Sequence, residues 1–248
     1  MKLARLLDRE PEQLAYLQLL APDDIRELRE QVTDMLFEAH DQTLKRLAAS
    51  SKLLPVGIVA MIGQHAFGPM LSARISGLLD PDRAVDIAAK MPTEFLADIA
   101  VELDPRRARD VIAGMPADRI GEVTRELTGR GEYVTMGRFV GHLGDDALRE
   151  SVTTIDDATL LRTAFVLEER DRIDTLVDLV GEERIARLAE VAEREELWPE
   201  ALDLLMHLDP ERVAEGLARS EPEHRELVER RAREHGVELP TVASEGAV

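Results

Sequence analysis

The chain has 248 residues, and its 31 Lys and Arg against 50 Asp and Glu give a formal net charge of −19. It contains no Cys, which excludes disulfide frameworks, thiolate metal centres and cysteine nucleophiles. The negative charge argues against nucleic acid as a partner, because such binding needs cations that neutralise phosphates.

The N-terminal stretch has a basic start, with Lys2 and Arg5, but Asp8 and Glu10 interrupt it before any apolar run suited to a secretory signal. We therefore expect a cytoplasmic protein. From Pro22 to about Lys52, apolar residues recur at helical spacing and predict one long helix. Its apolar stripe is narrow, so we expect it to pack on the rest of the chain; a homodimer through a coiled coil is the alternative.

The stretch from Leu53 to Ala73 carries no charged residue and is long enough to suggest a transmembrane helix. Glycine, proline and polar residues interrupt it, at Gly63, Gln64, His65, Gly68 and Pro69. Proline and glycine break helices, and polar groups are costly inside a bilayer. We therefore predict an apolar hairpin of two short helices that meet at Gly68–Pro69, with no stable membrane insertion.

Residues 42–79 contain Lys45, Arg46, Lys52 and Arg74 but no acid. Because the whole chain is −19 and this segment is +4, the other residues carry −23. A cation in an apolar stripe needs an anionic partner, access to water or a ligand head group. In one interpretation the hairpin is a buried N-terminal cap of the following repeats, His65 and Gln64 hydrogen-bond to backbone, and Arg74 pairs with a carboxylate of the next repeat.

In the other interpretation the hairpin encloses an apolar molecule with an acidic end, such as a fatty acid or lipid. The residues that would line this cavity are Met61, Gln64, His65, Phe67, Met70 and Arg74. Flexible Met side chains and one Arg suit such a ligand. A third interpretation, docking on an anionic membrane, fits less well with the strongly negative remainder of the chain.

An internal repeat begins at Leu79, where LDPDRAVDIAAKMP is followed 24 residues later, at Leu103, by LDPRRARDVIAGMP. Asp80 and Asp104 are expected to cap helices, with Pro81 and Pro105 in the first turn. Such short helices bury too little alone, so neighbouring pairs must stack. The rhythm continues through breaks near residues 129–131, 144–146, 155–157, 169–171, 181–182, 198–199 and 208–210.

These patterns predict an all-α protein in three parts. Residues 1–78 form an N-terminal region with the long helix and the hairpin. Residues 79–235 form an α-solenoid, a right-handed superhelix of about six short helix pairs with degenerate repeats of about 24 to 28 residues. Residues 236–248 form a disordered tail, because they contain Gly and Pro without helical periodicity.

The repeats resemble the cytoplasmic N-terminal superhelical domain of the MgtE family of magnesium transporters. The residues that carry the resemblance are Leu79, Asp80, Pro81, Ala84, Met91, Pro92, Leu103, Asp104, Pro105, Ala108, Met115 and Pro116. The resemblance covers Leu79 to Leu127, and its motif concerns packing rather than chemistry. It therefore implies a fold, and transfers neither magnesium regulation nor ligand residues.

The sequence lacks phosphate-binding glycine loops, nucleophile elbows, calcium loops and close His ligand spacings. We therefore expect no catalytic residue, metal or cofactor, and a protein that is not an enzyme. The arginines of the repeats nearly balance the acids there. Some of them are expected to form a positive strip for an acidic protein partner, at Arg106, Arg107, Arg109 and Arg119.

Together these features predict a non-enzymatic helical-repeat protein that acts as a scaffold or regulator in protein–protein interaction. A carrier or sensor of an apolar anionic small molecule, held by residues 53–79, is the alternative.

Overall fold

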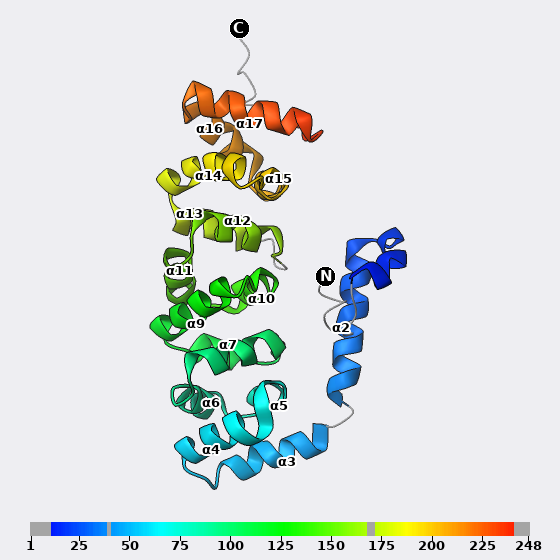
Figure 1. Cartoon of the computed structure of the whole chain (residues 1–248), viewed down its shortest axis with the longest axis vertical. Coiled ribbons are helices and arrows are strands. Elements are labelled where there is room, and N and C mark those ends of the chain that lie inside the picture. The colour runs from blue at the N-terminus through cyan, green and yellow to red at the C-terminus, as the bar shows by residue number, and fades with distance from the viewer. Residues whose placement is uncertain (1–10, 39–40, 168–171, 241–248) are drawn as a thin grey trace. The chain divides into compact units, whose positions relative to one another are not determined.

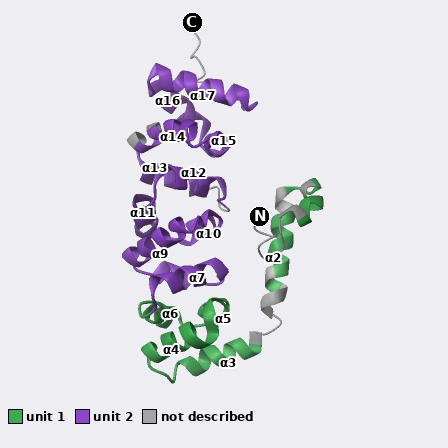
Figure 2. Cartoon of the chain, in the orientation of Figure 1, with its two compact units in different colours: residues 1–90 green, residues 91–248 purple. Residues whose placement is uncertain are grey.

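The computed structural model describes residues 11–38, 41–167 and 172–240, and all regular secondary structure in these ranges is helical (Figure 1). The all-α prediction is therefore confirmed. The chain divides into two compact units, residues 1–90 and residues 91–248 (Figure 2). The sequence-based boundary after residue 78 falls one helix earlier, so the helix that opens the first repeat belongs to unit 1.

The helical segments of unit 1 are η1 (Pro11–Leu19), α2 (Pro22–Glu38), α3 (Asp41–Ser51), α4 (Val56–Ile62), η2 (Gly63–Phe67), α5 (Gly68–Ser76) and α6 (Pro81–Ala88). Where the sequence predicts one long helix, the structure has α2 and α3, and residues 39 and 40 lie outside the described ranges. Helix α3 packs on α5, and α4 packs on α6. Leu44, Ala48 and Ile75 form a small buried cluster of α3 and α5, and Ala60 on α4 and Ala84 and Ile87 on α6 are buried as well.

The predicted break at Gly68–Pro69 is present. Gly68 has φ +70° and ψ 177°, a conformation that glycine adopts without the steric cost of a side chain. Pro69 then occupies the first turn of α5, where its missing N–H removes no helical hydrogen bond. The turn of π-helix in η2 joins this break to α4.

The helical segments of unit 2 are α7 (Thr93–Glu102), α8 (Arg109–Gly114), α9 (Ala117–Gly129), α10 (Tyr133–Phe139), η3 (Val140–His142), α11 (Asp145–Thr154), α12 (Asp157–Phe165), α13 (Ile173–Val180), α14 (Glu182–Arg194), α15 (Trp198–His207), α16 (Pro210–Arg219) and α17 (Pro222–Glu234). Contacts link α7 to α9, α9 to α11 and α11 to α13, and a second series links α10 to α12 and α12 to α14 (Figure 1). Helices two apart in the chain thus pack together, as stacked helix pairs require. The α-solenoid and its right-handed turn stay predictions.

One continuous core runs through unit 2, from Ala97 on α7 to Ala232 on α17. Its most deeply buried large side chains are Leu148, Leu161, Ile173 and Leu202. Burial of side chains this size stabilises a fold by about 1.5–3 kcal/mol each. This core is much larger than the cluster around Ile75 in unit 1.

Most helix boundaries in the repeats follow the sequence signals. Asp80 caps α6 by accepting a hydrogen bond from the Arg83 backbone N–H at 3.4 Å, and Asp209 caps α16 through the N–H groups of Glu211 and Arg212. The breaks near residues 129, 144, 155, 181, 198 and 208 all coincide with helix ends. The predicted break at 169–171 lies outside the described residues.

The prediction that a helix starts at Pro105 is wrong. Residues 105–108 form a turn, and α8 begins at Arg109. The Asp104 side chain is buried, whereas the capping residues Asp80 and Asp209 are exposed. Asp104 accepts a hydrogen bond from the Arg106 backbone N–H at 3.1 Å, which closes an Asx-turn, and a further one from the Arg106 guanidinium at 2.9 Å.

The predicted disordered tail begins with residues that pack. Val237 and Leu239 lie against the core of unit 2, and the Val237 N–H donates to the Ala232 carbonyl at 2.8 Å. Residues 241–248 lie outside the described ranges, so the prediction of disorder there stays a prediction.

Candidate functional site

The residues predicted to line a ligand cavity lie on α4, η2 and α5, and most are exposed. Met61 and Met70 are 51% and 57% exposed, and Gln64 and His65 are exposed as well. The prediction that the hairpin is buried is therefore wrong for these four residues. His65 Nδ1 lies 3.1 Å from the Met61 carbonyl oxygen, and this is a backbone contact of the kind that the buried-cap interpretation expected.

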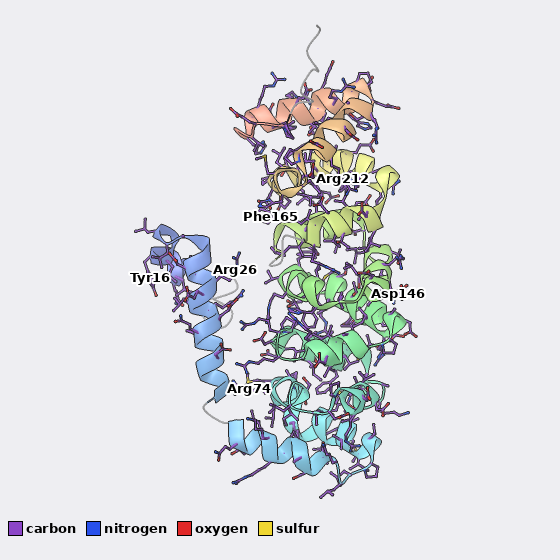
Figure 3. All side chains as sticks on the ribbon, turned by 180° about the vertical axis from the view of Figure 1, so that it is seen from behind. Tyr16, Arg26, Arg74, Asp146, Phe165 and Arg212 are labelled. Carbon is purple, nitrogen blue, oxygen red and sulfur yellow. The ribbon has the colours of Figure 1, made fainter. Side chains whose placement is uncertain are left out.

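Phe67 and Arg74 are half-buried, unlike the four exposed residues. Phe67 packs against the small core formed by Leu44, Ala48 and Ile75, so it supports α5 instead of facing solvent. Arg74 lies on the last turn of α5, and Figure 3 shows its side chain. The structure thus separates the six predicted residues into the exposed Met61, Gln64, His65 and Met70, the packed Phe67, and the half-buried Arg74.

We call residues 42–79 the acid-free segment. It exposes six large apolar side chains, at Leu47, Leu53, Leu54, Ile58, Met61 and Met70. Lys45, Arg46 and Lys52 are exposed beside them. Of the twelve large apolar side chains exposed among the described residues, ten belong to unit 1 and only Phe165 and Met206 belong to unit 2. Exposed apolar area is typical of interaction sites, so the acid-free segment is the candidate functional site.

The run Val56–Ser76 is long and apolar enough to cross a membrane by length and composition alone. It has 21 residues with mean hydropathy 1.3, and 17% of its most apolar window is buried. A single helix that passes this test is weak evidence, since core helices pass it too. The non-helical backbone at Gly68 interrupts the run. The absence of stable membrane insertion stays a prediction.

The arginines predicted to form a partner-binding strip have internal partners in unit 2. Arg106 donates to both carboxylate oxygens of the buried Asp104, at 3.1 and 2.9 Å, and Arg107 lies 3.7 Å from the same carboxylate. Burial raises the pKa of Asp104, but hydrogen bonds and charge from Arg106 outweigh it and hold the pKa below its usual value. Arg109 is exposed at the start of α8.

Arg119 also binds within unit 2. Its guanidinium donates to the Met91 carbonyl, to Thr93 Oγ1 at 2.8 Å and to the Glu122 carboxylate. The Met91 carbonyl follows the end of the preceding repeat helix, where backbone acceptors lack helical partners. A strip that includes Arg106, Arg107 and Arg119 as partner-binding residues is therefore disfavoured, because these side chains already hold the turns of the repeats together.

The hydrogen bond from an arginine to an earlier backbone carbonyl recurs along the chain, and this recurrence was not predicted from the sequence. Arg83, Arg119 and Arg184 are each the third residue of their helix and follow an acidic residue. Each donates to a carbonyl that lies 28 to 32 residues earlier. Arg212, which Figure 3 labels, has the same position in α16. It pairs with the Asp178 carboxylate at 2.6 Å. The signal available in the sequence was the repeated acid–arginine pair just after each helix start.

A cavity of about 80 Å³ lies inside unit 2. Its walls are almost wholly apolar, and its polar members are Thr124, Ser151 and Thr163. The Thr124 and Ser151 hydroxyls lie 3.1 Å apart, whereas Thr163 Oγ1 is buried without a hydrogen-bond partner among the described residues. An unsatisfied buried hydroxyl costs about 1–3 kcal/mol. We interpret this place as a packing defect in the core of unit 2.

Within the ranges that the structure describes, no group of three or more His, Asp and Glu side chains is placed to hold a metal ion. Comparisons with protein-family models, with curated proteins and with solved structures found no match for this chain. The candidate functional site is therefore the acid-free segment.

Proposed function

We propose that the chain is a cytoplasmic, non-enzymatic binding protein, a scaffold or regulator whose acid-free segment binds a protein partner. The observation that carries this proposal is the exposure of six large apolar side chains beside exposed Lys45, Arg46 and Lys52. Apolar area supplies most of the driving force in protein association. The cations select a partner surface that carries carboxylates.

The same residues also suit a carrier of an apolar anionic molecule. The exposure of Met61 and Met70, at 51% and 57%, favours the protein partner. A ligand site buries most of the surface of a small molecule, whereas side chains half open to water suit a partner that covers a wide area. The resemblance to the superhelical domain of the MgtE family adds only a fold to this proposal.

The experiment is site-specific photo-crosslinking in cells of the native host. A photoreactive amino acid replaces Met61 or Met70, and the matched control replaces Met206, which lies on α15 and is 52% exposed. We expect protein adducts at the first two positions and few at the third. A second variant, Lys52→Glu, reverses one cation and is expected to reduce the adducts.

Two results would contradict the proposal. Adducts made only with lipid would favour the carrier, and equal adducts at Met206 would show that exposure alone determines the reaction. Peptide mapping of each adduct by mass spectrometry distinguishes these results.

A further inference from the structure

The charge of α2 is opposite to that of the acid-free segment. Helix α2 has six acidic and two basic residues, a net charge of −4, whereas the acid-free segment carries +4. This sequence therefore carries both complementary charges, and no different protein is needed to supply one of them. Complementary charge steers association and fixes the register of two surfaces.

Helix α2 is also amphipathic. Ile25, Leu28 and Val32 follow the spacing that places apolar side chains on one helix face. Leu28 is 38% exposed, and the preceding residues Leu19 and Leu20 are 93% and 45% exposed. The N-terminal part of the chain therefore exposes apolar area of its own, next to carboxylates.

Helix α2 is longer than either helix of the hairpin. At about 1.5 Å per residue, its 17 residues span about 25 Å. The break at Gly68 divides residues 56–76 into α4, η2 and α5, which expose Ile58, Met61 and Met70. An amphipathic helix laid on an apolar surface is a common mode of recognition, with anchors three, four or seven residues apart.

We propose that the acid-free segment of one copy binds α2 of a second copy. This inference rests on the proposed function and names the partner. Each chain carries both surfaces once, so two copies bind reciprocally through a twofold axis and form a closed dimer. In this dimer Ile25, Leu28 and Val32 face the exposed apolar side chains of α4 and α5, and acids of α2 face Arg46 and Lys52.

The absence of Cys makes disulfide crosslinking a clean test of this dimer. Leu28→Cys and Met61→Cys are introduced into separate full-length chains, one of them labelled with ¹⁵N, and the chains are mixed under mild oxidation. We expect a mixed disulfide dimer, identified by its intermediate mass. The matched control replaces Met61→Cys by Met206→Cys, whose site on α15 is similarly exposed, and it is expected to give little mixed dimer.

Charge reversal provides a second readout, the dimer dissociation constant measured by analytical ultracentrifugation. Glu27→Lys on α2 and Arg46→Glu on α3 are each expected to raise this constant about tenfold. If these charges face each other across the dimer, the doubly substituted chain recovers most of the lost affinity. We expect the dissociation constant to depend less on salt concentration in the single variants than in the unsubstituted chain.

A monomer at all concentrations overturns the inference. So does an intramolecular disulfide in the chain carrying both Leu28→Cys and Met61→Cys without any mixed dimer, because the occupant is then the chain's own α2. A third result also overturns it: the unsubstituted chain sediments with vesicles of anionic lipid, and the Met61→Asp variant does not. The surface then binds a membrane. If photo-crosslinking at Met61 still captures a different protein, the proposed function stands and only its second-copy form fails.

Discussion

Glu193 joins the single tryptophan of the chain to the last described helix. Its carboxylate accepts hydrogen bonds from Trp198 Nε1 at 2.7 Å and from Arg231 on α17 at 2.9 and 2.5 Å. Hydrogen bonds from Arg231 and then from Trp198 lower the pKa of Glu193 from 4.5 to about 2. The carboxylate therefore stays charged through the pH range in which an ordinary Glu becomes neutral.

This shift predicts a pH dependence with a definite sign. A carboxylate with a lowered folded-state pKa stabilises the fold above its unfolded pKa and loses that contribution as the pH falls through the folded pKa. We expect the fluorescence of Trp198 to change with a midpoint well below pH 4.5, toward 2, as α17 loosens. Glu193→Gln should remove this transition, and Glu195→Gln should leave it. A midpoint near 4.5 in the unsubstituted chain would show that the hydrogen bonds are not formed.

Residue-scale contacts were the least accessible to prediction from the sequence. Asp104 has the same Asp–Pro signal as the helix cap at Asp80, but its carboxylate is buried and accepts hydrogen bonds from the Arg106 guanidinium. Similarly, the helical periodicity placed Met61 on an apolar face. It could not predict that the helices from α3 to α6 leave this side chain exposed. Both depend on partners distant in space or on side-chain geometry.

At the scale of helices, glycine determines how closely α10 approaches the end of α12. A Cβ at Gly137 would lie 2.9 Å from the Val166 carbonyl oxygen and 3.0 Å from the Val166 side chain. We predict that Gly137→Ala lowers the free energy of unfolding by about 1–3 kcal/mol, because the backbone must move. Gly216→Ala is the matched control, since it lies inside α16 with open space around it.

The control variant should stabilise the chain by about 0.5–1 kcal/mol, because alanine loses less backbone entropy than glycine in a helix. Urea unfolding followed by the fluorescence of Trp198 measures both changes. Equal effects of the two substitutions would contradict the close packing of α10 on residue 166.

Arg184 connects α14 to the turn between α11 and α12. Its guanidinium donates to the carbonyls of Val152 and Ile155 at 2.5 and 2.6 Å and to Asp157 at 2.5 Å. Its side chain is only 16% exposed. We predict that Arg184→Met lowers the free energy of unfolding by about 1.5–3 kcal/mol, because buried carbonyls lose a charged donor.

Arg187 provides a control on the same helix and the same carboxylate. It lies 3.7 Å from Asp157 and its side chain is 54% exposed, so Arg187→Met should cost less than about 1 kcal/mol. Thermal and urea unfolding of the two variants compare them directly. If Arg187→Met costs as much as Arg184→Met, attachment through the backbone carbonyls is not what stabilises this turn.

At the scale of helices the sequence was informative, because a helix start depends on a few adjacent residues. The Asp–Pro pairs at residues 80 and 209 and the glycines at 144 and 181 all coincide with observed helix boundaries. The arginine contacts that attach one repeat to an earlier one were not predicted. They join residues about 30 apart, and the local pattern contains no information on which carbonyl lies within reach.

At the scale of the whole molecule, the two units differ in how their apolar residues are used. Unit 2 buries a continuous core from Ala97 to Ala232, whereas the acid-free segment buries only two large apolar side chains, Leu44 and Ile75, and exposes six. Composition predicted enough apolar residues for folding, and charge counting identified the unusual segment. Neither could predict its exposure, because exposure depends on which helices pack against it.

The most direct test of binding by the acid-free segment is hydrogen–deuterium exchange, measured peptide by peptide on the full chain at low and high protein concentration. Ile75 is the only large apolar side chain of α4 and α5 that is buried, so we expect their amides to exchange quickly when the surface is free. We predict that peptides covering residues 56–76 gain protection at high concentration, while peptides from α11 to α14 are protected equally at both. Equal, strong protection of residues 56–76 at every concentration would contradict it.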